Sequence, residues 1–335
     1  MKRFLSIIGL IGLFAFSNNL YAVKVINFKH NFENFWDEAK GKDFIEQEKS
    51  WNKNIESIDP VFYDFFVWGK EHSSTWKENR KITLKELFSM YSEIDMDQYL
   101  KTYDEYEKTI TGVLKKYDNR APDYKANITI MIAPGITWGG SYAKISKNNK
   151  EYLGLGIDKY FEFFLQGKSL PIEPLTIHEM FHHYHFTIRG HKISKSFDNY
   201  LKNGKLFWQL WDEGMAVWGT GYIGENENFD YILLGNKGLY DPTQNNYYAK
   251  LFLKDLNNPA IDLKKPINYK KWFGSNVKNN PLGEKTPPMI GYYLGWVVIK
   301  GIEAQGIKRE EFMNWDYEEA KPHIIEQLKI ISQNK

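Results

Sequence analysis

Residues 178–185 read His-Glu-Met-Phe-His-His-Tyr-His and contain the pattern His-Glu-x-x-His at His178, Glu179 and His182. On an α-helix, residues four apart point in nearly the same direction, so the two imidazoles can bind one metal ion. Glu179 stands beside them and can take a proton from a water on that ion. The pattern predicts a zinc (Zn2+) site with Glu179 as the catalytic general base. An ordinary helix with hydrogen-bonded histidines is the alternative.

A catalytic zinc ion usually has three protein ligands and one open position. The aromatic-rich segment 206–218 is a predicted helix, and its Glu213 follows His182 by 31 residues. A carboxylate among so many apolar side chains needs a buried partner, which a metal ion provides. A third histidine six residues after His182 would be another solution, but Ile188 occupies that position. Glu213 is therefore the predicted third ligand.

The pattern His-Glu-x-x-His followed by Glu-Gly-Met-Ala at 213–216 resembles the gluzincin clan of zinc metallopeptidases. Within that clan it most resembles the bacterial families described as predicted zinc-dependent proteases. The resemblance covers the order of elements over 124–305 and is strong at 175–185 and 211–218. It implies a thermolysin-like zincin fold, a zinc cofactor and a peptide or protein substrate. It also implies the same site residues: ligands His178, His182 and Glu213, and base Glu179.

The chain departs from the clan at one position near the third ligand. Thermolysin-like members often place an aspartate four residues after that ligand, where it orients a ligand histidine, but this chain has Val217. Asp212 is a candidate for that role. His185 lies seven residues after His178 on the same helix stripe, and it either supports a ligand, contacts the substrate or competes as a ligand. His183 faces elsewhere and is predicted to be structural.

Gluzincins commonly use a tyrosine or histidine from a later helix to stabilise the oxyanion that forms during hydrolysis. The segment 288–296 is the best source in this chain, and one of Tyr292 and Tyr293 is expected to face the zinc as a catalytic residue. Ordinary core packing of both tyrosines is the open alternative. Gly291 and Gly295 are four residues apart and would allow this helix to pack closely on a neighbour.

The elements that position these residues follow from the pattern of apolar residues. Apolar and aromatic residues recur at three- and four-residue spacing over 31–117, which predicts helices. The β-branched run 127–132 and the runs 142–145 and 152–157 predict strands. Segment 154–157 is the expected edge strand that would bind an extended peptide. Helices follow after Pro174, so the fold class is α+β, with a small mixed sheet and active-site helices.

The start of the chain resembles an export signal. Lys2 and Arg3 precede an apolar run over 4–16, and Ala22 offers a cleavage site. This run is shorter than the roughly 20 residues that span a bilayer. We therefore expect a signal peptide at 1–22, a mainly helical N-terminal region over 23–120 and a zincin-like catalytic domain over 121–335. The expected location is periplasmic or secreted in a bacterium, without stable membrane insertion after cleavage.

Composition narrows the classes of site and partner. The chain has no cysteine, which excludes disulfides, thiolate zinc sites and cysteine nucleophiles. Its formal net charge is +2, and Lys2 and Arg3 carry that excess, so the remainder is balanced. A balanced chain predicts no nucleic-acid partner. The oligomeric state is not predicted.

Three functions are compatible with these patterns. The first is a zinc peptidase, a hydrolase of the metalloprotease type. The second is a zinc amidase that acts on cell-wall or other amide substrates with the same chemistry, since specificity depends on pocket shape. The third is a non-catalytic binding protein on a zincin scaffold, but a retained Glu179 argues against it because binding alone needs no general base.

Overall fold

The computed structural model describes residues 23–71, 73–145, 147–167, 171–190, 205–234, 240–258, 261, 266–274, 280–283 and 286–333. The expected signal peptide at 1–22 lies outside this part of the chain. The described residues form helices and one four-stranded sheet of mixed direction. The predicted α+β class with a small mixed sheet is therefore confirmed.

The strands of the sheet lie in the spatial order β1-β2-β4-β3. Their bounds are β1 (Lys24–Asn27), β2 (Thr129–Ala133), β3 (Gly140–Ile145) and β4 (Lys150–Gly156). β1, β2 and β4 run parallel, and β3 runs antiparallel to β4. The three predicted strands are present. β1 was not predicted, because four residues are too few to show an alternating pattern.

The prediction that 154–157 forms an edge strand is wrong. Leu155 lies opposite Ile132 of β2 on one side and opposite Gly140 of β3 on the other, so β4 is an inner strand. The small residue at Gly154 makes room for a side chain of the protein itself, because a Cβ there would lie 2.3 Å from the Phe66 ring. Among the described strands, the edge next to the His-Glu-x-x-His helix is β3.

Helices make up most of the rest of the described chain. Before β2 they are α1 (Lys29–Ala39), α2 (Phe44–Asn54), the 3-10 turn η1 (Glu56–Ile58), the π-helix η2 (Phe62–Val67), α3 (Trp76–Glu93) and α4 (Met96–Arg120). After β4 they are α5 (Ile157–Leu165), α6 (Ile172–Arg189), α8 (Lys205–Gly224), α9 (Phe229–Ile232), the 3-10 turn η5 (Pro242–Gln244), α10 (Asn245–Leu256), α11 (Pro266–Phe273), α12 (Ile290–Ala304), α13 (Arg309–Phe312) and α14 (Tyr317–Gln333). All three segments that carry predicted site residues are helical, in α6, α8 and α12.

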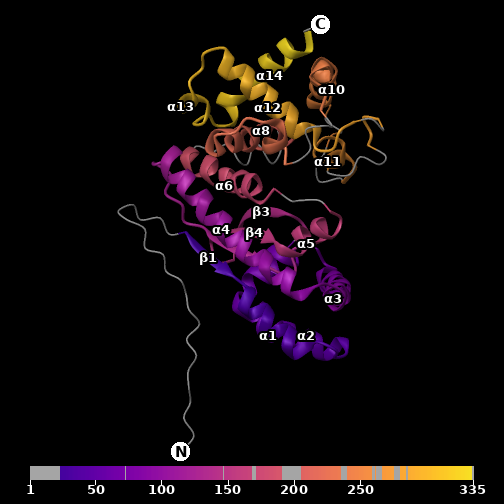
Figure 1. The fold of residues 1–335 in the computed structure, drawn as a ribbon. Helices are drawn as coiled ribbons and strands as arrows, with labels where there is room; N and C mark the ends of the chain where they lie inside the picture. Colours follow the sequence, from indigo (N-terminus) through magenta and orange to yellow (C-terminus); the bar gives the residue numbers. More distant parts are fainter. Residues whose placement is uncertain are drawn as a thin grey trace, which may run out of the picture.

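Helix α6 lies at the middle of the molecule. On one side it packs against α4 and β3, and on the other against α8, which in turn packs against α12 (Figure 1). The N-terminal helices α1 to α3 and the C-terminal helices α10 to α14 lie at opposite ends of the ribbon. Residues from α6, α8 and α12 can therefore meet near the centre.

The helices before β2 are attached to the rest of the fold through a buried carboxylate. Asp158, at the start of α5, is 3% exposed. It accepts hydrogen bonds from the Tyr91 hydroxyl at 2.8 Å, the Tyr99 hydroxyl at 2.6 Å and the Gly135 N–H at 2.6 Å. These donors come from α3, α4 and the turn after β2, so one side chain joins three segments.

Helices α8 and α12 cross at two glycines. A Cβ at Gly214 would lie 2.5 Å from the backbone of Gly295, and a Cβ at Gly295 would lie 2.4 Å from the Leu210 carbonyl oxygen. Both distances are too short for any side chain, so only glycine allows this approach. The predicted close packing at Gly295 is confirmed. The crossing brings Tyr292, which follows Gly291 in α12, towards Glu213 of α8.

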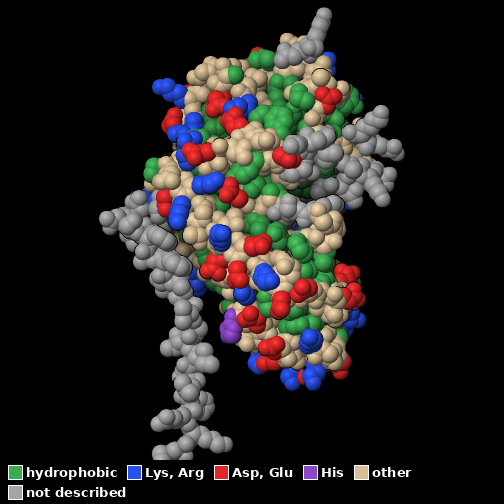
Figure 2. Space-filling model, in the orientation of Figure 1, with side chains coloured by type: hydrophobic (Ala, Val, Ile, Leu, Met, Phe, Trp, Pro, Cys, Tyr) green, Lys and Arg blue, Asp and Glu red, His purple; other side chains and the backbone are tan. Residues whose placement is uncertain are grey.

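The surface in Figure 2 has basic and acidic side chains interspersed, with no large area of one sign on that face. Many of the aromatic residues are core residues, and fully buried examples include Trp51, Trp211 and Trp272. None of the helices within the described ranges is long and apolar enough to cross a membrane.

Candidate metal centre

Helix α6 presents His178 and His182 from successive turns on the face that packs against α8. His178 is 2% exposed, and the two imidazole rings lie nearly perpendicular with centroids 4.9 Å apart. Glu213 reaches the same point from the middle of α8 and is 7% exposed. The structure thus brings together the three predicted ligands from two adjacent helices.

One carboxylate oxygen of Glu213 faces both imidazoles. Its Oε2 lies 3.3 Å from His178 Nε2 and 3.4 Å from His182 Nε2. One ligand atom from each of the three residues lies within 4.8 Å of the other two. Ligands about 2.0–2.1 Å from a tetrahedral ion are separated by about 3.3 Å, which matches both measured distances. The three residues can therefore hold a metal ion.

The distances within the cluster support the same interpretation. His178 Nε2 and Glu213 Oε2 are hydrogen-bonded at 3.3 Å, and the same Oε2 lies 3.4 Å from His182 Nε2. Both distances are longer than the 2.7–3.2 Å that is usual for an N–H···O hydrogen bond. Two nitrogens that face one carboxylate oxygen at this spacing fit a bound cation better than a cluster held by strong hydrogen bonds.

Neighbouring side chains orient two of the three ligands. Gln209, one turn before Glu213 on α8, donates to Glu213 Oε1 at 2.7 Å and leaves Oε2 for the imidazoles. Asp212 Oδ2 lies 3.3 Å from His182 Nδ1, on the side of the ring away from Glu213. A carboxylate behind a ligand histidine fixes its orientation and makes it a better ligand. Asp212 is thus placed for the role that it was predicted to take. Arg189 Nη2 in turn lies 3.5 Å from Asp212 Oδ1.

The charges in the cluster favour a cation at its centre. Burial by itself raises the pKa of Glu213, but the imidazoles of His182 and His178 outweigh burial and hold this pKa below its ordinary value. Burial lowers the pKa of His182, but Asp212 and Glu213 outweigh it and raise this pKa well above its ordinary value. The centre thus holds three carboxylates, those of Asp212, Glu213 and Glu179, against the Arg189 guanidinium and a His182 imidazole whose raised pKa favours its cationic form. A divalent ion would balance this excess negative charge.

Glu179 lies beside the three ligand residues and next to the edge strand. Burial raises its pKa, and the imidazoles of His178 and His182 offset only part of that increase. The Tyr142 backbone N–H of β3 also favours the ionised form of Glu179 and offsets a further, smaller part of this rise in pKa. A Cβ at Gly140 of the same strand would lie 3.4 Å from Glu179 Cγ. The predicted base therefore stands between the ligands and β3.

Only one of the two predicted tyrosines faces the cluster. The Tyr292 ring is stacked on His178 with centroids 5.9 Å apart and an interplanar angle of 23°. Tyr293 is stacked on Tyr240 and on Trp296 instead, with centroids 4.9 Å and 6.2 Å away. Successive helix residues point about 100° apart, so the two tyrosines cannot share a face. Tyr292 meets the predicted position and Tyr293 belongs to the core.

The other histidines of α6 have different surroundings. His183 has both ring nitrogens paired, at 2.5 Å with the Tyr124 hydroxyl and at 2.5 Å with Glu151 Oε2, so its contacts are those of a structural residue. His185 is 1% exposed and has no hydrogen-bond partner at either nitrogen. Its Nδ1 lies 4.0 Å from Asp212, behind the ligands, and burial lowers its pKa well below the ordinary value. His185 is not one of the converging ligand atoms.

Sequence reasoning missed three residues at the centre. Gln209 could have been found from its position four residues before Glu213, which places both on one face of α8. Arg189 could not have been found, since a basic residue at the end of a helix is commonly a solvated charge. Tyr269 of α11 and Tyr292 of α12 both lie near the Phe273 ring, at centroid distances of 5.9 Å and 6.1 Å, and the sequence gives no sign of this shared neighbour.

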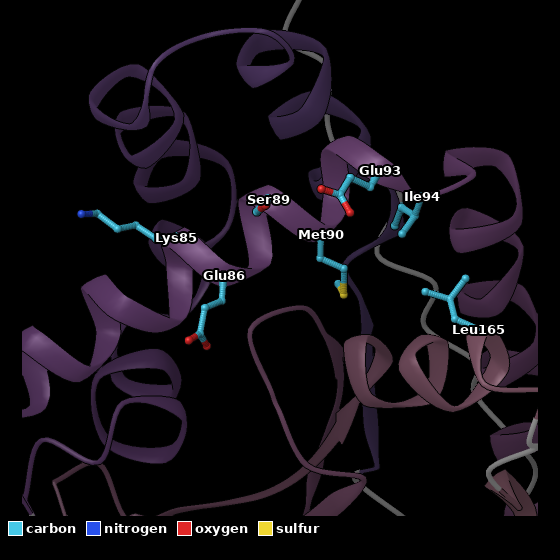
Figure 3. Close-up of a pocket in the computed structure, with 7 residues that line it drawn as sticks. All are labelled: Lys85, Glu86, Ser89, Met90, Glu93, Ile94 and Leu165. Carbon is cyan, nitrogen blue, oxygen red and sulfur yellow. The ribbon is translucent and has the colours of Figure 1, made fainter.

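An open groove of about 650 Å³ lies away from the metal centre. It runs between α3 and the end of α5, with Met90, Ile94 and Leu165 as its apolar residues (Figure 3). Lys85, Glu86, Ser89 and Glu93 complete the lining. The lining includes none of the predicted ligands, so the groove is separate from the chemistry described above.

A scan against models of protein families found no match. Searches of curated proteins and of solved structures also found none. The functional interpretation therefore depends on the geometry of the side chains in this chain.

Proposed function

We propose that this protein is a zinc-dependent hydrolase of peptide bonds, with a zincin fold of the gluzincin type. The observation that carries the proposal is the convergence of His178 Nε2, His182 Nε2 and Glu213 Oε2 at the spacing of a tetrahedral zinc site. The adjacent carboxylate of Glu179 favours an enzyme over a structural metal site, because structural zinc sites use all four positions for protein ligands. Nitrogen and carboxylate oxygen ligands in this geometry favour zinc.

When bound, zinc would lower the pKa of a water molecule and polarise the carbonyl group to be attacked. Glu179 takes the proton of the attacking water as the water oxygen bonds to the carbonyl carbon. It then passes this proton to the amine nitrogen as the carbon–nitrogen bond breaks. The Tyr292 hydroxyl donates a hydrogen bond to the carbonyl oxygen as negative charge develops there.

The edge strand gives a reason to prefer a peptide as substrate. β3 borders the metal centre and pairs with β4 on only one side among the described strands. An extended peptide can add to such an edge through backbone hydrogen bonds, which do not depend on its sequence. Because Gly140 lies beside Glu179, a peptide on this edge would have its backbone close to the base.

A Glu179→Gln variant tests the proposal. We expect it to keep its zinc, measured by elemental analysis, and to lose about 1000-fold in hydrolysis, within the range for a general base. Glu173→Gln is the matched control, because Glu173 is on the same helix but pairs with Lys116 at 2.8 Å. Casein, short peptides and cell-wall fragments form the substrate panel. Unchanged hydrolysis by Glu179→Gln would remove the catalytic role, and cleavage of cell-wall amides alone would favour the amidase.

We also propose that the protein is exported to the periplasm or the exterior of a bacterium. The support is the sequence of residues 1–22, with its basic start, apolar run and small residue at position 22. Mass spectrometry of the N-terminus of the mature protein tests this. A chain that begins at Val23 is expected, and a chain that keeps Met1 contradicts it.

A further inference from the structure

Arg189, the last residue of α6, is fixed by three contacts behind the metal centre. Its Nε donates to the His185 carbonyl oxygen of its own helix at 2.9 Å. Its guanidinium lies 4.7 Å from the centre of the Trp208 ring, and its Nη2 lies 3.5 Å from Asp212 Oδ1. Trp208 and Asp212 are four residues apart and therefore share one face of α8. Arg189 thus joins the end of α6 to that face.

The two carboxylate oxygens of Asp212 have different neighbours. Oδ2 lies 3.3 Å from Nδ1 of the predicted ligand His182, and Oδ1 lies 3.5 Å from the Arg189 guanidinium. The Asp212 side chain is 28% exposed, whereas that of Arg189 is 1% exposed. Solvent is therefore within reach of the carboxylate, which could turn outwards if nothing held it. The contact with the buried guanidinium favours the inward orientation, in which Asp212 faces His182.

A buried guanidinium so close to the predicted ligands has two opposing effects on a bound cation. Its charge repels the cation, and this repulsion is stronger in the protein interior than in water. If Arg189 only balanced the charge of Asp212, its removal would relieve the repulsion and tighten zinc binding. If Arg189 holds Asp212 behind His182, its removal would weaken zinc binding, because a carboxylate behind a ligand histidine makes it a better ligand. The two roles therefore predict changes of opposite sign.

We propose that Arg189 is a positioning residue of the metal centre: it holds Asp212 against His182 and thereby raises the affinity for zinc. A planar guanidinium suits this role, since it stacks on Trp208 through its face and reaches Asp212 through its edge. The inference rests on the zinc site of the proposed function and deepens it, but it does not depend on which bond the protein hydrolyses. It predicts that Arg189 acts on zinc binding only through Asp212.

The zinc affinity of the metal-free protein tests this role, measured by competition with a chromophoric chelator. Arg189→Gln removes the guanidinium and is expected to raise the Kd for zinc about 10-fold, the lower end for loss of support behind a ligand. Arg120→Gln is the matched control. Arg120 also lies over an aromatic ring, that of Tyr222 at 4.5 Å, and its Nη1 lies 3.3 Å from Glu225. The Kd of this control should stay at the wild-type value.

A double-mutant cycle with Asp212→Asn tests the coupling. Asp212→Asn alone is expected to raise the Kd about 10- to 100-fold. Adding Arg189→Gln should raise it no further, because the carboxylate through which Arg189 acts is already gone. A general disturbance of the packing between α6 and α8 would instead weaken zinc binding in both backgrounds. Circular dichroism checks that each metal-free variant is folded. If Arg189→Gln is not, Arg189→Lys replaces it in the cycle, with an expected rise of about 3-fold because it keeps the charge and loses only the planar group.

A tighter or unchanged Kd in the folded Arg189 variant would overturn the positioning role and leave Arg189 as a balancing charge. Independent, multiplying effects of the two substitutions would overturn it as well. The proposed function fails separately. If Glu179→Gln hydrolyses peptides at the wild-type rate, the peptidase is lost and the role of Arg189 in zinc binding remains. If His178→Ala binds zinc with wild-type affinity, the metal site and the role of Arg189 fail together.

Discussion

Asp158 and Glu213 are both buried carboxylates, but their surroundings have opposite effects. Burial raises the pKa of each. Around Asp158 the hydrogen bonds from Tyr99, Gly135 and Tyr91 offset burial only in part, and its pKa is raised to about 6. Around Glu213 two imidazoles outweigh burial and hold the pKa below its ordinary value. The difference indicates that a carboxylate paired with neutral donors is structural, whereas a carboxylate oxygen that faces two buried imidazole nitrogens marks a place for a cation.

Removal of a metal ligand is expected to have the largest effect among the variants that test this difference between the two carboxylates. His178→Ala is expected to weaken zinc binding by more than about 100-fold, which is the upper end for residues that only support a ligand. The reason is that two ligands from different helices cannot close a tetrahedral site. Competition with a chromophoric chelator measures the affinity. Wild-type affinity in this variant would show that the cluster around Glu213 is not a metal site.

Removing the other carboxylate should affect stability and not metal binding. Asp158→Ala leaves two buried hydroxyls and one N–H without their acceptor, and we expect a loss of about 3 kcal/mol in the free energy of unfolding. Zinc affinity per folded molecule should stay unchanged. Urea unfolding of wild type and variant measures the loss. A variant that folds normally but no longer binds zinc would contradict the separation of the two centres.

The raised pKa of Asp158 predicts a specific dependence of stability on pH. The folded state holds this proton more tightly than the unfolded state, with a pKa of about 6 against 3.8. The stabilising contribution is therefore complete below about pH 4 and is lost as pH rises through about 6. The total is about 3 kcal/mol. The difference in unfolding free energy between wild type and Asp158→Asn, measured from pH 4 to 7, isolates it. A difference that is constant with pH, or that grows as pH rises, would show that the hydrogen bonds outweigh burial.

A smaller effect is expected from the residue behind His182. Asp212→Asn keeps the shape of the side chain but removes its charge, and zinc affinity should fall about 10- to 100-fold. The matched control is Asp230→Asn in α9, an acid on a different helix from the ligands. Isothermal titration with zinc or cobalt measures both. An unchanged affinity would mean that Asp212 only balances the charge of Arg189.

The site could be predicted to the extent that it depends on neighbours along a helix. His178, Glu179 and His182 are fixed relative to one another by the helical repeat, and Glu213 was recognisable as an acid in an apolar helix. The choice between Tyr292 and Tyr293 needed the rotation of α12, which depends on its contact with α8. Tyr269 and Arg189 depend on how separate helices pack.

The fold, too, could be predicted only where it depends on local sequence patterns. The strands β2, β3 and β4 were evident from runs of β-branched and apolar residues, and α6, α8 and α12 from their length and composition. β1 was missed because it is stabilised by pairing with β2 rather than by its own sequence. The edge was assigned to 154–157 instead of β3 because strand order is a property of the whole sheet and cannot be read from glycine content.

The crossing at Gly214 and Gly295 sets a distance that the chemistry depends on. Glu213 precedes one glycine, and Tyr292 lies three residues before the other, so the gap between ligand and phenol is determined where two bare backbones touch. A single methyl group at either glycine would push α8 and α12 apart, and it would thereby separate the Glu213 carboxylate from the Tyr292 phenol. The absence of a Cβ atom at these two glycines thus sets the dimensions of the centre. A substitution at either glycine would alter the reactivity without changing any side chain that takes part in the reaction.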